Sequence, residues 1–235
     1  MNPEQNDIAI LFFSRTEKEE IRHKKFIDGD QSRANLQVSK SLISGTRKIL
    51  KKSNYDYHTF SEDKQKGNSF GERFSNALSE VFSTGCNGVI AIGNDCPQLS
   101  INDIDRASNS LKNGQDVLGP ATDGGIYLLG IRKDDFDANS LNQLSWQSGD
   151  LFRDINEYFS SKDSRVDLLE TKRDIDNEAD LKEILKLETN NTIVKSLQKI
   201  FIKSQRPKIS SYIDAKIINT FHRSLGLRGP PRLSH

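Results

Sequence analysis

Short apolar runs separated by polar stretches predict six strands along this chain. Residues 8–13 form a continuous apolar run bounded by polar residues, and residues 88–92 form a second one. Continuous runs of this length are typical of strands buried on both faces of a parallel sheet. The weaker strand patterns show alternation or only a few apolar residues, and they lie at residues 55–60, 117–118, 126–131 and 166–169.

Apolar residues at helical spacing predict helices between these strands. Residues 32–52, with Ser32 as a candidate cap, and residues 70–82 each place apolar side chains on one face. A capping-box pattern at Ser100 opens a helix that extends to about residue 113. The remaining helical patterns lie at residues 150–159 and at residues 180–187, the latter capped by Asp176 or Asn177. Residues 14–31 read as a charged loop.

The alternation of strands and helices predicts an α/β fold built on a doubly wound, mostly parallel sheet with right-handed crossovers. This rhythm stops at residue 190, so we expect one domain over residues 1–189 and a helical extension over residues 190–235. The extension contains two helical patterns, at residues 193–202 and 212–225, and a Gly-Pro-Pro tail. One function of this extension could be to form a homodimer.

Composition narrows the class of protein. The 235 residues include 34 Lys and Arg and 33 Asp and Glu, and this near-equal number of positive and negative charges argues against a general nucleic-acid binder. Cys86 and Cys96 are too isolated for a disulfide framework or a zinc site. No stretch has the length of a membrane span, and the polar start of the chain does not resemble a signal peptide. We therefore expect a cytoplasmic protein.

Acidic residues follow three of the predicted strands. Asp95 follows the strand at residues 88–92, Asp123 lies between two strands, and Asp174 and Asp176 follow the last strand. Ligands of open parallel sheets bind at the carboxyl ends of the strands, and carboxylates that converge there suit a hard cation such as Mg²⁺. Each of these residues also has a simpler interpretation as a turn or helix-cap residue, which the spacing leaves open.

Candidate phosphate-binding cations lie in two places. Arg15 and Lys24 belong to the charged segment after the first strand, and Arg73 lies in the first turn of a predicted helix. A solvated loop, or a surface ion pair of Arg73 with Glu72 or Glu80, is the alternative in each case. Neither a P-loop nor a dinucleotide-binding glycine motif is present. Cys96 has no histidine near it in the sequence, which favours a packed thiol over a nucleophile.

Four blocks of sequence together resemble a known family. Residues 93–99 read Gly-Asn-Asp-Cys-Pro-Gln-Leu, residues 118–130 contain Thr-Asp-Gly-Gly, and residues 173–181 contain Asp-Asn-Glu-Ala-Asp-Leu. Gln65, Gly67 and residues 71–74 form the fourth block. In this order they resemble an uncharacterised bacterial family with the glycosyltransferase-A fold, domain of unknown function 2064. Some of its members are described as glycosyltransferases of arsenosugar biosynthesis. The resemblance covers about residues 8–186.

The resemblance implies a function and assigns roles. The wider superfamily of nucleotide-diphospho-sugar transferases implies a metal, Mg²⁺ or Mn²⁺, held by Asp95 and Asp176, and it places Asp123 on the acceptor side as the catalytic residue. Arg15, Lys24 and Arg73 would bind the phosphates of a nucleotide-sugar or nucleoside triphosphate, and a small molecule would accept the transferred group. Glycosyl transfer is the first expectation, and nucleotidylyl transfer with release of pyrophosphate is the alternative.

One segment departs from the family pattern. The family has a glycine-containing loop of the form Pro-Gly-x-x-Lys-Thr-Arg-Leu after the first strand, whereas residues 14–25 here lack the glycine turn. Lys24 would replace the family lysine. This departure motivates a third hypothesis, a nucleotide-binding protein with impaired catalysis.

Overall fold

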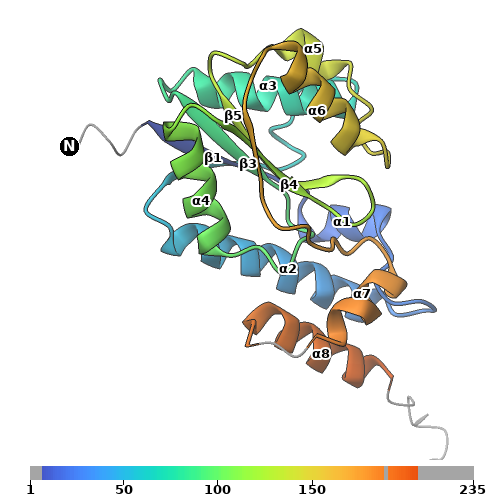
Figure 1. Cartoon of the computed structure of the whole chain (residues 1–235). Coiled ribbons are helices and arrows are strands. Elements are labelled where there is room, and N and C mark those ends of the chain that lie inside the picture. The colour runs from blue at the N-terminus through green and yellow to red at the C-terminus, as the bar shows by residue number, and fades with distance from the viewer. Residues whose placement is uncertain (1–6, 188–189, 206–235) are drawn as a thin grey trace, which may run out of the picture.

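The computed structural model describes residues 7–187 and 190–205, in which strands and helices alternate (Figure 1). The strands are β1 (Ile8–Phe13), β2 (Asp56–Phe60), β3 (Gly88–Ile92), β4 (Asp116–Pro120), β5 (Ile126–Arg132) and β6 (Val166–Leu168). The helices are α1 (Glu17–His23), α2 (Ser32–Lys52), α3 (Phe70–Phe82), α4 (Ile101–Lys112), α5 (Ala138–Asn142), α6 (Leu151–Ser161), α7 (Glu178–Leu185) and α8 (Thr192–Ser204).

The six strands form one sheet in the order β2-β1-β3-β5-β4-β6. β5 is antiparallel to both of its neighbours, and the other adjacent strands pair in parallel. Five strands therefore run in one direction, which confirms the mostly parallel α/β sheet. β5 is reversed because only residues 121–125 separate it from β4, and a parallel crossover needs a dozen residues or more.

Helices cover both faces of the sheet, because the side chains of the central strands alternate between two cores. Ala9, Leu11 and Phe13 of β1 face the core that α3, α5 and α6 complete. Ile8, Ile10 and Phe12 face the opposite core, which α2 and α4 complete. Figure 1 shows the same division, with α3, α5 and α6 on one side of the sheet and α2 and α4 on the other. The doubly wound architecture is thus confirmed.

A third apolar cluster joins the C-terminal helices to α2. Ile193, Val194 and Leu197 of α8 are buried against apolar residues of α2 and α7. α8 is the described part of the predicted helical extension, and Figure 1 shows it alongside α2 and α7. The predicted helix at residues 212–225 and the Gly-Pro-Pro tail lie outside the described residues. A domain boundary at residue 189 remains a prediction, as does a homodimer formed through the extension.

Several local predictions differ from the structure. Residues 17–23 form helix α1 within the segment predicted to be a loop, and the short α5 was not predicted. Gln31, not Ser32, occupies the N-cap position of α2, and its side chain makes no capping hydrogen bond. In the part of the chain described here, no helix is both long and apolar enough to cross a membrane.

Candidate active site

A cavity of about 650 Å³ opens at the carboxyl ends of β1 and β3. Residues from the loops after β1, β2 and β3, from the β4–β5 turn and from the segment before α7 line it. All six residues predicted as site residues lie in its wall, and these are Arg15, Lys24, Arg73, Asp95, Asp123 and Asp176. The structure thus brings together side chains that are up to 161 positions apart in the sequence.

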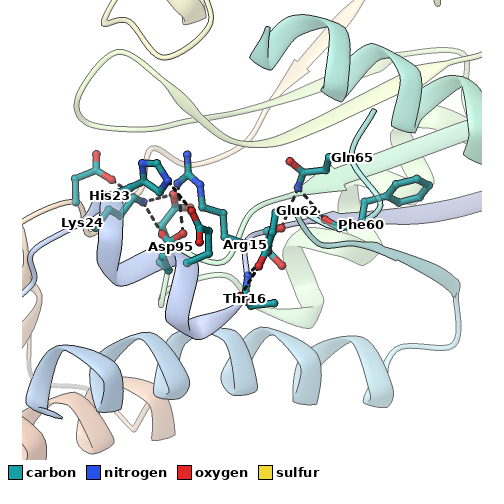
Figure 2. Close-up of polar contacts among 12 residues, drawn as sticks. Arg15, Thr16, His23, Lys24, Phe60, Glu62, Gln65 and Asp95 are labelled. Carbon is teal, nitrogen blue, oxygen red and sulfur yellow. Dashed lines mark hydrogen bonds and ion pairs between the residues drawn. The ribbon is translucent and has the colours of Figure 1, made fainter. Parts of the chain in front are cut away.

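Lys24 lies between the two predicted metal-binding carboxylates. Its Nζ is 2.8 Å from Oδ2 of Asp95 and 2.7 Å from Oδ1 of Asp176. Figure 2 shows Lys24 pointing toward Asp95, with dashed lines marking the contacts among these side chains. Lys24 itself is largely buried, whereas the side chains of Asp95 and Asp176 are 30% and 47% exposed. The carboxylates therefore share one cationic partner and remain open to the cavity.

Two backbone contacts explain why the carboxylates meet. The backbone N–H of Ile175 donates to the carbonyl oxygen of Asp95 at 3.0 Å, and Lys25 forms an isolated bridge with Asn177. The first contact holds the segment before α7 beside the end of β3, and the second holds it beside the residues that follow α1, where Lys24 lies. Asn177 caps α7 through its side chain. The carboxylate of Asp176 consequently does not cap the helix, which answers one alternative that the sequence left open.

A buried carboxylate, Glu20, completes the surroundings of Lys24. Glu20 is only 2% exposed, and its Oε1 lies 3.4 Å from Lys24 Nζ while its Oε2 lies 3.4 Å from Arg15. Burial alone would lower the pKa of Lys24, but Asp95, Glu20 and Asp176 outweigh it and raise that pKa above its ordinary value. For Asp95, burial is likewise overcome by the Lys24 charge, which lowers the pKa of Asp95. Both groups are charged at neutral pH.

Asp174 is a further acidic residue of the same cavity that the sequence analysis noted without assigning it a role. Burial, and then the neighbouring carboxylates of Asp95 and Asp123, raise the pKa of Asp174 well above its ordinary value. Its Oδ1 atom is buried and has no hydrogen-bond partner among the described residues. A buried oxygen without a hydrogen-bond partner destabilises the folded state, so this atom is available to a hydrogen-bond donor or a cation that binds in the cavity.

Asp123 lies at the turn between β4 and β5. Its Oδ1 accepts a hydrogen bond from the backbone N–H of Gly125 at 2.9 Å, so part of the simpler turn interpretation is correct. Gly124 has a φ of +90°, and a Cβ there would collide with the carbonyl oxygen of Gly149. The turn is also held by the backbone N–H of Phe152, which donates to the Gly124 carbonyl oxygen at 2.9 Å. The exposed carboxylate of Asp123 thereby keeps a fixed place in the cavity wall.

The two arginines differ in their partners. Arg15 contacts Glu20, whereas Arg73 forms no ion pair within the described residues. The carboxylate of Glu72 instead completes the capping box at Ser69, and Glu80 pairs with Lys66. The alternative of a surface ion pair for Arg73 is therefore not what the structure shows, and Arg73 lines the cavity with its Nη1 donating, among the described residues, only to the carbonyl oxygen of Asn68, at 3.5 Å.

Two residues that received no predicted role, Gln65 and Glu62, hold loops of the cavity wall in place. The side-chain amide of Gln65 donates to the carbonyl oxygens of Ser14 and Phe60, both at 3.0 Å, and so ties the ends of β1 and β2 together. Glu62 accepts from the backbone N–H and the hydroxyl group of Thr16, at the start of α1 (Figure 2). Gln65 belongs to the fourth sequence block, which was the available signal, whereas Glu62 had none.

The thiol of Cys96 is buried beside this site. Burial, and then the charge of Asp174, raise the pKa of this thiol well above its ordinary value. A thiol that resists deprotonation is a poor nucleophile, which agrees with a packing role.

Trp146 both lines the cavity and packs on Phe70 and Phe74, with its ring centroid 5.4 Å and 4.7 Å from theirs.

The sheet order, the helices on both faces and the site at the strand ends define a fold of the nucleotide-diphospho-sugar transferase type. A protein of Desulfovibrio desulfuricans G20, provisionally named a nucleotide-diphospho-sugar transferase, superposes with a TM-score of 0.75 at 21% identity. The superposition covers 85% of this chain and 97% of that one. The sequence of residues 42–155 matches that of a protein family, DUF2064, which is described as an uncharacterized protein conserved in bacteria. This match confirms the family resemblance and includes three of the four sequence blocks, although the block with Asp176 lies beyond it.

Weaker structural similarities extend to other proteins. Rv0371c of Mycobacterium tuberculosis H37Rv, in complex with manganese, has a TM-score of 0.42 at 14% identity and covers 75% of this chain and 97% of its own. The 4-diphosphocytidyl-2C-methyl-D-erythritol synthase of Anaerococcus prevotii has a TM-score of 0.43 at 10% identity, with coverages of 85% and 99%. No curated protein matches the sequence. The Desulfovibrio structure is therefore the comparison that defines the fold.

Proposed function

We propose that this protein is a metal-dependent transferase that acts on a nucleotide-linked substrate, with glycosyl transfer from a nucleotide-sugar as the reaction. One observation carries the proposal. Asp95 and Asp176 come from separate loops, yet an oxygen of each lies within 2.8 Å of one cationic atom, Lys24 Nζ. Two carboxylates that already share a cation can hold a metal at the same place, at the strand ends where this fold binds ligands.

The residues present fit Mg²⁺ or Mn²⁺. Both ions prefer oxygen ligands, and Asp95 and Asp176 supply carboxylates that are partly open to the cavity. Asp174 lines the same cavity, and its buried Oδ1, which has no hydrogen-bond partner among the described residues, is a further oxygen ligand for a bound cation. As the side chains now lie, no three acidic, histidine or cysteine residues of the described segments are arranged as a metal site. Because Lys24 Nζ lies between Asp95 and Asp176, Lys24 would have to turn away for a metal to bind both carboxylates.

The charge of the cavity also favours metal dependence. Seven acidic side chains line it, against three Lys and Arg side chains, Arg15, Lys24 and Arg73. A diphosphate would be repelled by such a wall unless a divalent cation accompanied it. When bound, that cation would neutralise negative charge on the diphosphate of the leaving group.

The remaining residues then have separate tasks. Arg73, which has no carboxylate partner, and Arg15 would bind phosphate oxygens, and Lys24 would join them once it leaves Asp95 and Asp176. Asp123 is exposed in the β4–β5 turn that lines the cavity, and only its Oδ1 accepts a hydrogen bond within the described residues. Its Oδ2 would accept the proton of an acceptor hydroxyl group during transfer. The acceptor would be a small molecule, and we expect the reaction to take place in the cytoplasm.

Product analysis tests the reaction. The purified full chain is incubated with Mg²⁺ or Mn²⁺ and a panel of nucleotide-sugars or nucleoside triphosphates. We expect release of a nucleoside diphosphate from a nucleotide-sugar, at a rate that Asp95→Asn lowers at least a hundredfold. Asp134→Asn is the matched control, because Asp134 is exposed and lies after β5, away from the cavity. Pyrophosphate release from a triphosphate would instead identify a nucleotidylyltransferase.

Binding measurements distinguish an enzyme from a binding protein. Residues 14–25 contain helix α1 (Glu17–His23) where the family has a glycine-containing loop, which is the observation that favours impaired catalysis. Calorimetric titration of nucleotides is therefore done with and without Mg²⁺. Metal-dependent binding that Asp95→Asn removes, without any turnover, would support the binding protein. If nucleotides do not bind under either condition, both proposals are wrong.

A further inference from the structure

A second cavity, of about 830 Å³, lies between α2 and α8 and shares no lining residue with the first cavity. We name it the α2–α8 groove. Its floor includes the partly buried Ile49 and Ile200, and its walls are rich in hydroxyl and amide side chains. Five exposed lysines stand around it, and these are Lys40, Lys48, Lys52, Lys199 and Lys203.

The charge of this groove is unbalanced. No acidic residue lines it, and none of its five lysines forms an ion pair within the described part of the chain. Some exposed cations elsewhere do have a carboxylate partner, as in Arg106–Asp167 and Lys182–Glu178, but the described lining of the groove has no carboxylate to offer its lysines. Five neighbouring ammonium groups without counter-charge create a positive potential that attracts an anionic partner.

The sequence concentrates positive charge in the same part of the molecule. Residues 190–235 contain nine of the 34 Lys and Arg but only one of the 33 Asp and Glu, which is Asp214. The near neutrality of the whole chain therefore conceals an acidic first part and a basic last part. Segregation of this kind indicates interaction with an anionic surface or polymer. It also excludes residues 206–235 as the occupant of the groove, because they carry six Lys and Arg and one Asp.

We propose that the α2–α8 groove and the outer side of α8 attach this protein to anionic phospholipid headgroups at a membrane surface. Lys195, Lys199 and Ile202 recur at helical spacing on α8, and Ile202 is 60% exposed, the most exposed of the large apolar side chains in the described residues. Lysines flanking an exposed apolar side chain are typical of peripheral attachment to anionic bilayers.

Nucleic acid is the competing anionic partner, and the groove does not suit it. The groove lining contains no aromatic side chain on which a base could stack and no arginine for bidentate contact with phosphate or guanine. Lysines alone serve as point charges for headgroup phosphates. The attachment does not depend on the proposed transferase reaction, since the two cavities have no residue in common.

Vesicle co-sedimentation of the full chain tests the proposal. We expect binding to vesicles of phosphatidylcholine with phosphatidylglycerol, weak binding to phosphatidylcholine alone, and release by salt. The double variant Lys48→Glu/Lys199→Glu is expected to bind at least roughly thirtyfold more weakly, because each lysine lost costs about fivefold and each glutamate adds repulsion from the anionic surface. The control Lys64→Glu/Lys133→Glu changes two exposed lysines that lie outside the groove, and it is expected to lose much less.

A third variant measures how much the exposed apolar side chain of Ile202 contributes to vesicle binding, apart from the lysines. Ile202→Ser is expected to weaken binding severalfold even at high salt, where the lysines contribute little. Equal binding by the groove variant and its control would overturn the proposal, because the basic residues 206–235 would then bind on their own. The proposal also fails if the wild-type chain does not bind anionic vesicles, or if duplex DNA or RNA displaces it from them completely. Circular dichroism melting confirms that each variant is folded.

Discussion

Lys24 Nζ lies 2.8 Å from Oδ2 of Asp95, although the two residues are 71 positions apart in the sequence. Asp176 contacts the same ammonium group from a third segment. The ammonium group of Lys24 thus lies in the binding site that we propose for a metal ion. This arrangement makes Lys24 both a stabiliser of the metal-free protein and a competitor of the metal, and the two effects can be measured separately.

Lys24→Met is expected to destabilise the metal-free protein by about 3 kcal/mol, because it leaves the carboxylates of Asp95, Asp176 and Glu20 close together without a counter-charge. Mg²⁺ should then raise the melting temperature of the variant more than that of the wild type, since binding to the folded state alone stabilises it. Thermal unfolding in Mg²⁺ and in a chelator provides the measurement. Lys186→Met, which breaks an exposed ion pair with Glu183, is the control. Identical metal responses in both variants would refute the competition.

Asp176→Asn separates metal binding from stability. The side chain of Asp176 is 47% exposed, so we expect the free energy of unfolding to fall by less than about 1 kcal/mol. The affinity for Mn²⁺, followed by electron paramagnetic resonance, should nevertheless fall at least tenfold, because one of two carboxylate ligands is lost. An unchanged Mn²⁺ affinity would remove Asp176 from the site and leave Asp174 as the candidate second ligand.

Gly124→Ala tests the turn that carries Asp123. The substitution places a Cβ against the Gly149 carbonyl oxygen at a residue with a φ of +90°, so both a collision and backbone strain oppose it. We expect a loss of about 3 kcal/mol in urea unfolding. Gly29→Ala is the matched control, since Gly29 also has a positive φ, +77°, but no atom within reach of an added Cβ. Its expected cost is about 1 kcal/mol, and equal costs in both variants would mean that the close approach at Gly149 is unimportant.

Much of this architecture could be predicted from the sequence because it follows from local patterns. The apolar runs of β1 and β3 and the helical spacing of α2 reflect burial, which side-chain type reveals directly. Helix α1 lacks that signal, since its only buried residue is Glu20 and only one apolar side chain, the partly buried Ile21, packs on the core. The antiparallel direction of β5 follows from the short β4–β5 connection. We expected regularly alternating strands and helices, and that expectation gave this short connection too little weight.

The predicted site shows where sequence patterns stop being informative. Strand ends indicated Asp95, Asp123 and Asp176, and all three line one cavity. The position of Lys24 between two of them depends on strand order and on the hydrogen bond from Ile175 to Asp95, neither of which any local spacing encodes. Segregation of charge toward the C-terminus was present in the sequence, but the groove that gives it a location required the packing of α8 on α2.

A buried carboxyl group at the other end of the sheet predicts the pH dependence of stability. Asp116 is 0% exposed, and burial, although opposed by a hydrogen bond from Ser164, raises the pKa of Asp116 to about 7. The folded state therefore binds a proton between about pH 4 and pH 7 that the unfolded state has released. Stability should fall as the pH rises through this window and become constant above it.

Asp116→Asn mimics the protonated carboxyl group and tests this assignment. Its side-chain oxygen can still accept from the backbone N–H of Arg132, and no charge remains to be desolvated. We expect the variant to be more stable than the wild type by on the order of 2 kcal/mol at about pH 8, and similar to it at about pH 4. Urea unfolding across this range provides the measurement, with Asp134→Asn as an exposed control. A difference that is independent of pH would refute the assignment.

Truncation tests whether α8 belongs to the folded domain or is a separable extension. Ile193, Val194 and Leu197 are buried between α2 and α7, and each buried aliphatic side chain contributes about 1.5–3 kcal/mol. A chain ending at residue 189 loses all three, so we expect it to lose about 5 kcal/mol and to unfold or aggregate. A chain ending at residue 205 keeps them and should melt close to the full chain. Size-exclusion chromatography of the full and 205-residue chains also tests the homodimer, because a dimer formed by residues 206–235 would become a monomer. An unchanged melting temperature in the 189-residue chain would show that α8 is dispensable, and the boundary predicted at that residue would then be a true domain boundary.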